Sequence, residues 1–167
     1  WKNVVNILIK EYDLNKNSNL LDIGCAKGFL VNDFQEDARV GNAAGVDISP
    51  YALIMASRLK MKGRFMCSNV TNLPFEDNQF DFVFCKDTLH NILNEEELII
   101  AINEIERVGK KSWIRVAAYN NIEQKQIIDK WATFANCYFT ADEWLNIFEK
   151  SSYSGTYDWF HPSQEIV

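Results

Sequence analysis

An apolar strand and a glycine-rich turn follow each other at Leu20-Leu21-Asp22-Ile23-Gly24-Cys25-Ala26-Lys27-Gly28. Residues 19–23 predict a short buried strand, because apolar residues dominate the run and a glycine ends it. The apolar residues between Gly28 and Phe34 predict a helix that opens directly after the turn. Glycine at position 24 permits a tight turn and the close approach of a ligand. Exposed amides at the start of such a helix favour a carboxylate or a phosphate.

Strands and helices are expected to alternate along the rest of the chain. Further strands are predicted at 45–48, 64–67, 80–85, 112–118 and 155–160. Helices are predicted over 2–13, after Ser49-Pro50, after the capping box that starts at Asn94, and after the capping box that starts at Thr140. This alternation predicts an α/β, Rossmann-like fold in which helices flank a mostly parallel sheet. No linker or repeat divides residues 1–167, so we expect one domain.

Composition excludes several classes of protein. The 167 residues are 47% hydrophobic and 13% aromatic, which rules out a disordered chain. The formal net charge of −6 argues against a nucleic-acid partner, which needs a basic surface. No apolar run approaches the roughly 20 residues of a membrane span, so no membrane association is expected.

The four cysteines, Cys25, Cys67, Cys85 and Cys137, form no Cys-x-x-Cys pair, and the chain has only two histidines. We therefore expect no metal site. Cys25, Cys67 and Cys85 lie in or beside apolar runs, which predicts buried free thiols and a cytoplasmic location.

Ligands of parallel α/β sheets bind where the strands end, so the residues after each predicted strand are candidate site residues. Asp47 ends the second strand, and its carboxylate could accept both hydroxyl groups of a ribose. The alternative is a solvated acid at a helix start. After the third strand, the Asn69 side chain could bond the edge of an adenine, and the Val70 amide could bond a ring nitrogen.

Three motifs together resemble the class I S-adenosylmethionine-dependent methyltransferases. They are Leu20 to Gly28, then Gly45-Val46-Asp47-Ile48-Ser49, then Leu73-Pro74-Phe75 with Phe80-Asp81-Phe82-Val83. The resemblance covers about residues 19–118. It implies the strand order 3-2-1-4-5-7-6 with an antiparallel last strand. It also implies S-adenosylmethionine as cofactor and S-adenosylhomocysteine as product.

The resemblance also implies a layout for the cofactor. The Gly24–Gly28 turn would hold the methionine moiety, Asp47 the ribose, and Ile48, Asn69 and Val70 the adenine. The predicted cofactor-binding residues therefore include Asp22, Gly24, Cys25, Ala26, Gly28 and Lys86 as well.

This sequence departs from the family pattern at three points. Ala26 stands where the family has glycine, which a negative φ would accommodate. Asn69 stands where the family often has aspartate, and it keeps an acceptor while adding a donor. Only six strands are predicted, so either the seventh lies beyond Val167 or the chain is a compact variant.

Methyl transfer needs a nucleophile aligned behind the methyl group and often a base that removes its proton. The predicted catalytic residues are His90, a candidate general base, and Asp87, which could orient His90 or the substrate. Both could instead be structural loop residues. The expected acceptor is a small molecule, such as a sugar or another oxygen or nitrogen nucleophile. An aromatic segment at 119–139, with Tyr119, Trp131, Phe134, Tyr138 and Phe139, is expected to lie on the substrate side. These aromatic residues could instead simply cover the sheet.

Two other functions compete with methyl transfer. A nicotinamide dinucleotide (NAD) oxidoreductase would need Gly-x-Gly-x-x-Gly, but Ala26 and Phe29 occupy the second and third glycine positions. A methyltransferase-like fold can also serve as a non-catalytic partner subunit. The presence of Gly24, Gly28 and Asp47 favours a chain that binds the cofactor. The sequence leaves the oligomeric state open.

Overall fold

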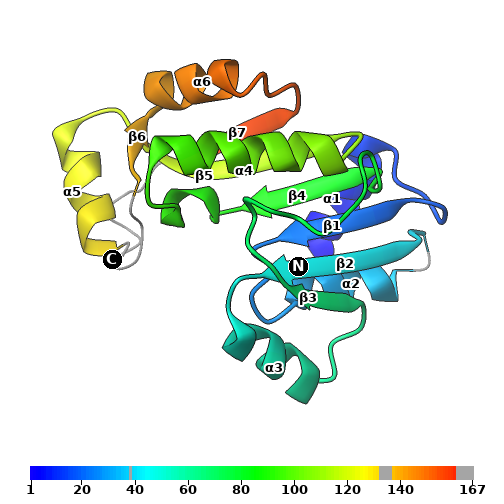
Figure 1. Cartoon of the computed structure of the whole chain (residues 1–167). Coiled ribbons are helices and arrows are strands. Elements are labelled where there is room, and N and C mark those ends of the chain that lie inside the picture. The colour runs from blue at the N-terminus through cyan, green and yellow to red at the C-terminus, as the bar shows by residue number, and fades with distance from the viewer. Residues whose placement is uncertain (38, 132–136, 161–167) are drawn as a thin grey trace.

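The structure is a computed structural model that describes residues 1–37, 39–131 and 137–160. Helices and strands alternate along it (Figure 1). The strands are β1 (Asn19–Ile23), β2 (Asn42–Asp47), β3 (Arg64–Cys67), β4 (Phe82–Lys86), β5 (Ser112–Tyr119), β6 (Phe139–Thr140) and β7 (Thr156–Phe160). The helices are α1 (Lys2–Tyr12), α2 (Phe29–Glu36), α3 (Pro50–Arg58), the 3-10 helix η1 (Leu89–Asn91), α4 (Glu95–Val108), α5 (Ile122–Trp131) and α6 (Ala141–Lys150).

The strands form one sheet in the order β3-β2-β1-β4-β5-β6, and β7 also pairs with β5. Each of these pairs is parallel. The predicted Rossmann-like sheet with flanking helices is therefore confirmed. β1 lies at its centre between β2 and β4, which places the turn after β1 where the strand order reverses.

The structure differs from the predictions beyond β5. It contains β6 and α5, which the sequence pattern did not indicate, so the count of six strands was one too few. β6 has two residues, too few for an alternating pattern to be read. Among the described strands none is antiparallel, and β7 occupies the place beside β5 in parallel orientation. The antiparallel last strand implied by the resemblance is thus not found in the described part of the chain.

Successive residues of the central strands point to opposite faces of the sheet and so feed two cores. Leu20, Phe82 and Phe84 pack with residues of α1 and α2 on one face. Leu21, Val83 and Cys85 pack with residues of α4 and α6 on the other. Because both faces are covered, β1 and β4 can be apolar almost throughout, as is typical of a parallel sheet.

Three helices, α3, α4 and α6, begin at side-chain caps. Ser49 Oγ accepts the Ala52 N–H at 3.3 Å, and Asn94 Oδ1 accepts the Glu97 N–H at 2.9 Å. Thr140 forms the predicted capping box with Glu143. These caps satisfy amides that would otherwise lack a partner, and they fix where each helix starts relative to the sheet.

All four cysteines are free thiols. Cys25 and Cys85 are buried as predicted, but Cys67 is exposed. The burial predicted for Cys67 was wrong because β3 is an edge strand with little covering it. In the described residues, no helix combines the length and the apolar character needed to cross a bilayer.

Trp144 anchors α6 to the sheet, and its replacement tests the packing of that face. The Trp144 side chain is fully buried, and its Nε1 donates to the Ala117 carbonyl of β5 at 3.0 Å. Replacing Trp144 with Phe removes this donor and some buried volume, so we expect the free energy of unfolding to fall by about 2 kcal/mol. Urea denaturation followed by circular dichroism measures the change.

The matched control is Leu145→Ala, at the next position of α6, where the side chain is 41% exposed. This replacement should alter the free energy of unfolding by less than about 0.5 kcal/mol. Equal losses in the two variants would contradict the anchoring role of Trp144.

Candidate functional site

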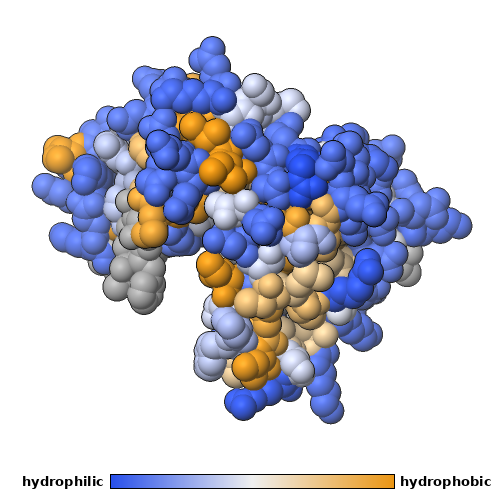
Figure 2. Space-filling model, viewed as in Figure 1, coloured by the Kyte–Doolittle hydropathy of each residue, from blue (hydrophilic) through white to orange (hydrophobic). Residues whose placement is uncertain are grey.

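A cavity of about 430 Å³ opens at the carboxyl ends of the parallel strands. Figure 2 shows the molecule hollowed on this side, between the α3 end and the α5 end, with hydrophobic residues along the edge. The lining residues come from the segments that follow β1, β2, β3 and β4. They are Ile23, Gly24, Ala26, Val46, Asp47, Ile48, Ser68, Asn69, Val70, Thr71, Asp87, Thr88, Asn91, Ile92, Leu93 and Glu97. Such a volume suits a small organic ligand.

The turn after β1 is packed so closely that two of its positions exclude a side chain. Gly24 has φ +72°, and a Cβ there would lie 2.0 Å from Thr88 Oγ1. Gly28 has φ +76°, and a Cβ there would lie 2.4 Å from the Phe65 ring. The backbone N–H groups of Gly24 and Cys25 both donate to the Val46 carbonyl, at 2.9 and 3.0 Å. Glycine at 24 and 28 is therefore required by sterics as well as by backbone conformation.

Asp47 joins this turn to the end of β2. Its Oδ2 accepts the Ala26 N–H at 2.8 Å, and its Oδ1 accepts the Ser49 N–H at 2.8 Å. The carboxylate lies in the cavity wall and is held in place from two sides. Each carboxylate oxygen has a further lone pair, so both can still accept a hydroxyl group from a ligand.

Ala26 adopts φ +48°, in the left-handed region. The negative φ under which the alanine was expected to be tolerated is not found. The N–H bond to Asp47 and the tight turn hold this residue in a conformation that costs a non-glycine residue about 1–2 kcal/mol. Backbone strain is therefore stored directly beside the cavity.

A second hollow of about 140 Å³ meets the first one at Gly24 and Ala26. Asp22, Cys25 and Lys86 line it, so the structure brings these three predicted residues together. Burial, reinforced by the charge of Asp47, raises the pKa of Asp22 to about 7, while Lys86 acts in the opposite direction. Burial also raises the pKa of the Cys25 thiol, which stays protonated at neutral pH.

The loop after β3 forms another wall of the main cavity. Asn69 and Val70 both line it, and Ile48 lines it from the end of β2. Asn69 Oδ1 accepts the Thr71 N–H at 3.1 Å, which fixes the side chain in a turn. The three residues predicted to hold an adenine therefore lie around one cavity.

The segment after β4 contributes Asp87 to the cavity, but His90 does not line it. Asp87 has φ +55° and pairs with Lys86 through Oδ2, while its buried Oδ1 has no hydrogen-bond partner among the described residues. His90 is 5% exposed, and burial lowers its pKa although Asp87 opposes this shift. A direct catalytic role for His90 is thus less well supported by the geometry than one for Asp87.

Several residues of the cavity were not among the predicted cofactor-binding or catalytic residues. Thr88, Ile92, Leu93 and Glu97 line it between β4 and the first turn of α4. The signal available for them was their place after a predicted strand, because every strand end faces the same edge of the sheet. Glu97 was assigned only to a helix cap.

The predicted aromatic segment supplies no residue to either hollow within the described part of the chain. Phe139 instead packs edge-on against Trp144, with ring centroids 5.1 Å apart. Phe134 and the side chain of Trp131 lie outside the described residues. The substrate-side role of this segment stays a prediction.

Replacing Ala26 with Gly tests the strain in the turn. Glycine removes the left-handed penalty but gives the unfolded chain more freedom, so we expect the free energy of unfolding to rise by about 0.5 kcal/mol. Chemical denaturation measures it. Ala52→Gly, in the first turn of α3, is the control, because in a right-handed helix the same change should lower stability by about 0.5–1 kcal/mol. Equal losses at both positions would refute strain at Ala26.

Comparisons with known proteins agree with this geometry. A family model described as a methyltransferase domain matches residues 21–112. An uncharacterized protein of Methanocaldococcus jannaschii is 36% identical over 109 residues, which cover 64% of this chain and 42% of that protein. A probable methyltransferase of Aspergillus luteorubrus is 30% identical over 122 residues, which cover 66% of this chain and 42% of that protein.

Among solved structures, the YcgJ protein of Bacillus subtilis superposes with a TM-score of 0.73 at 20% identity. The match covers 90% of this chain and 68% of that one. At this identity the likeness concerns the fold alone. The chain spans less than half the length of the two curated relatives described above.

Proposed function

Because the chain belongs to the class I S-adenosylmethionine-dependent methyltransferase family, we propose that it binds S-adenosylmethionine at the strand ends and transfers its methyl group to a small-molecule acceptor. The observation that carries the proposal is Asp47, whose carboxylate lies in the cavity wall and is fixed by two backbone N–H groups. A carboxylate held in this way is arranged to accept the two hydroxyl groups of a ribose.

The two connected hollows fit the two ends of this cofactor. Ile48, Asn69 and Val70 would hold the adenine in the larger one, beside Asp47. Asp22, Cys25, Ala26 and Lys86 would surround the methionine moiety in the smaller one. Gly24 and Ala26 line both hollows, and the absence of a side chain at Gly24 leaves room for Thr88 beside the turn.

The bound cofactor supplies an electrophilic methyl group, and the protein aligns the acceptor. Asp87 is the better placed of the two predicted catalytic residues, because it lines the cavity and keeps one carboxylate oxygen without a hydrogen-bond partner among the described residues. We assign it the orientation of the nucleophile, with oxygen or nitrogen acceptors, sugars included, as candidates. The wall made by Ile92 and Leu93 would contact the acceptor's apolar part.

The competing functions receive less support. An NAD site would need glycine at position 29, where Phe29 begins α2. A non-catalytic subunit would not need the fixed carboxylate of Asp47 or the strained Asp87. We propose that residues 1–167 form one methyltransferase domain that acts in the cytoplasm, a setting supported by the four free cysteines.

Calorimetric titration of S-adenosylhomocysteine tests the cofactor site. The wild-type chain should bind it in the micromolar range, and Asp47→Asn should weaken binding by about ten- to a hundredfold, because a charged acceptor is lost. Asp129→Asn, on α5 and away from both hollows, is the matched control and should bind as the wild type does. A folded wild-type chain that fails to bind would refute the proposal, and NAD in a parallel titration should give no heat.

The raised pKa of Asp22 predicts a pH dependence of cofactor binding. A cationic group in the smaller hollow favours the ionised carboxylate, so affinity for S-adenosylhomocysteine should rise as pH increases through about 7. Between pH 6 and pH 8 we expect a gain of up to about tenfold, since one proton is released on binding. Asp22→Asn should abolish this slope. A slope that persists in the variant would assign the titration to another group.

A further inference from the structure

One wall of the main cavity comes from a loop at the edge of the sheet. Residues 68–72 follow β3, which has four residues, pairs with β2 alone among the described strands, and is largely exposed. Contacts inside the loop give it a shape: Ser68 Oγ donates to the Asn72 carbonyl at 3.1 Å, and the Asn72 N–H donates to the Asn69 carbonyl at 3.1 Å. The start of the loop is attached to the sheet, because the Ser68 N–H donates to the Asp47 carbonyl at 3.2 Å, and Val70 packs against the core.

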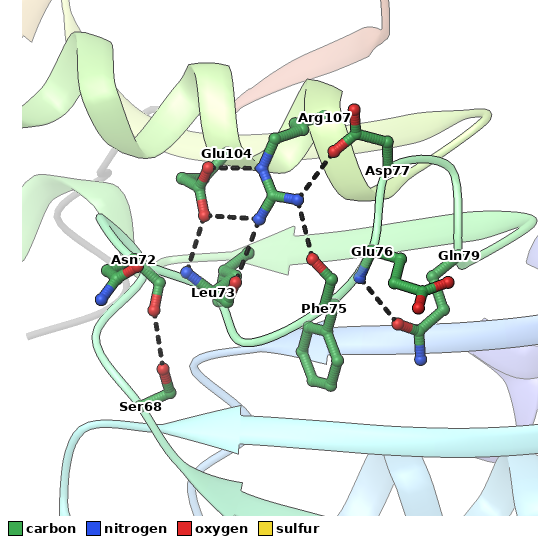
Figure 3. A network of polar contacts seen from close by, with 9 residues as sticks. All are labelled: Ser68, Asn72, Leu73, Phe75, Glu76, Asp77, Gln79, Glu104 and Arg107. Atoms are coloured by element: carbon green, nitrogen blue, oxygen red, sulfur yellow. Dashed lines mark hydrogen bonds and ion pairs between the residues drawn. The ribbon is translucent and has the colours of Figure 1, made fainter.

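The far end of the loop is held one residue later, at Leu73. Figure 3 shows Glu104 and Arg107 of α4 reaching the backbone of this segment from one side. The Leu73 N–H donates to Glu104 Oε2 at 2.7 Å, and Arg107 Nη2 donates to the Leu73 carbonyl at 3.0 Å. Arg107 Nη1 donates to the Phe75 carbonyl at 2.7 Å and to Asp77 Oδ1 at 2.9 Å.

The two side chains also hold each other. Arg107 Nε donates to Glu104 Oε1 at 2.6 Å, and Arg107 Nη2 donates to Glu104 Oε2 at 2.8 Å. The Glu104 side chain is 17% exposed and that of Arg107 is 30% exposed, so this two-bond pair is partly shielded from water. The bonds from Arg107 hold the pKa of Glu104 below its usual range, and the carboxylate stays ionised at neutral pH.

We propose that Glu104 and Arg107 are positioning residues for the adenine end of the cofactor site, which they shape by holding Leu73 and Phe75. This inference rests on the proposed function. Neither residue lines the cavity, so both act through residues 68–72, here called the adenine loop, which include Asn69 and Val70. A displacement of the Leu73 backbone would therefore also displace Asn69 and Val70.

The same helix also reaches the other wall of the cavity. Glu97, in the first turn of α4, lines the cavity as Leu93 does, whereas Glu104 and Arg107 lie about two to three turns further along. Because one rigid helix contacts both sides, the pair fixes how far the adenine loop stands from the segment after β4. The arrangement therefore sets the width of the cavity.

The test compares ligand affinity with stability in three variants. Arg107→Ala should weaken the binding of S-adenosylhomocysteine and of adenosine by the same factor, about tenfold, because a displaced loop loses a hydrogen bond to the adenine end. Arg107→Lys keeps the charge but not the forked donor geometry, so its affinities should lie between those of Arg107→Ala and the wild type. Calorimetry is run at a temperature where circular dichroism shows each variant to be folded.

Lys110→Gln is the matched control, because Lys110 pairs with Asp81 at 2.9 Å just after α4 and does not touch the adenine loop. It should bind both ligands as the wild type does. If Arg107→Ala does not fold, a loss of at least threefold in Arg107→Lys supports the proposal, and wild-type affinity in that variant overturns it.

The outcomes separate the two proposals. Variants at 107 that melt earlier but bind both ligands normally would make the pair merely structural and overturn this inference, while the loss in Asp47→Asn would leave the proposed function standing. A wild-type chain that binds neither ligand would overturn both. A loss for S-adenosylhomocysteine with none for adenosine would also overturn the inference, because the adenine end would then be intact.

Discussion

The turn after β1 is packed so tightly against its neighbours that it has no room for side chains at two positions, and the rest of the site is arranged around it. Thr88, in the segment after β4, packs against Gly24, and the Phe65 ring of β3 packs against Gly28. Three strands thus meet at one backbone turn. Gly24 and Ala26 of this turn line both hollows.

Asp47 places a fixed hydrogen-bond acceptor in the cavity wall beside this turn. By accepting N–H groups from Ala26 and Ser49, it connects the turn, the end of β2 and the start of α3. An acceptor that is already oriented loses little freedom when a ligand arrives. Asp22 lies below it, buried and close enough for their charges to interact, which makes the ionisation of Asp22 sensitive to a cation in the smaller hollow.

Strained backbone marks both sides of the site. Ala26 and Asp87 are non-glycine residues with positive φ, and each lines the main cavity. Strain of this kind persists only where the surroundings fix the conformation. At Ala26 the Asp47 carboxylate does so. At Asp87 the backbone N–H donates to the Arg115 carbonyl at 2.9 Å and the side chain pairs with Lys86. The adenine loop is held at its start by the Ser68 bond to the Asp47 carbonyl and just beyond its end by Glu104 and Arg107.

The sequence by itself predicted the α/β architecture and the strand ends whose following residues line the cavity. These features are local: apolar runs, glycines and caps at fixed spacing define each element, and parallel strands bring their ends to one edge. It could not show that Asp87 lines the cavity whereas His90 is buried and does not. The position of each side chain depends on how η1 packs against β5. The sequence also could not give the φ of Ala26 or the hold of Arg107 on Leu73. Only the tertiary structure decided these, since each arises from contacts between segments distant in the chain.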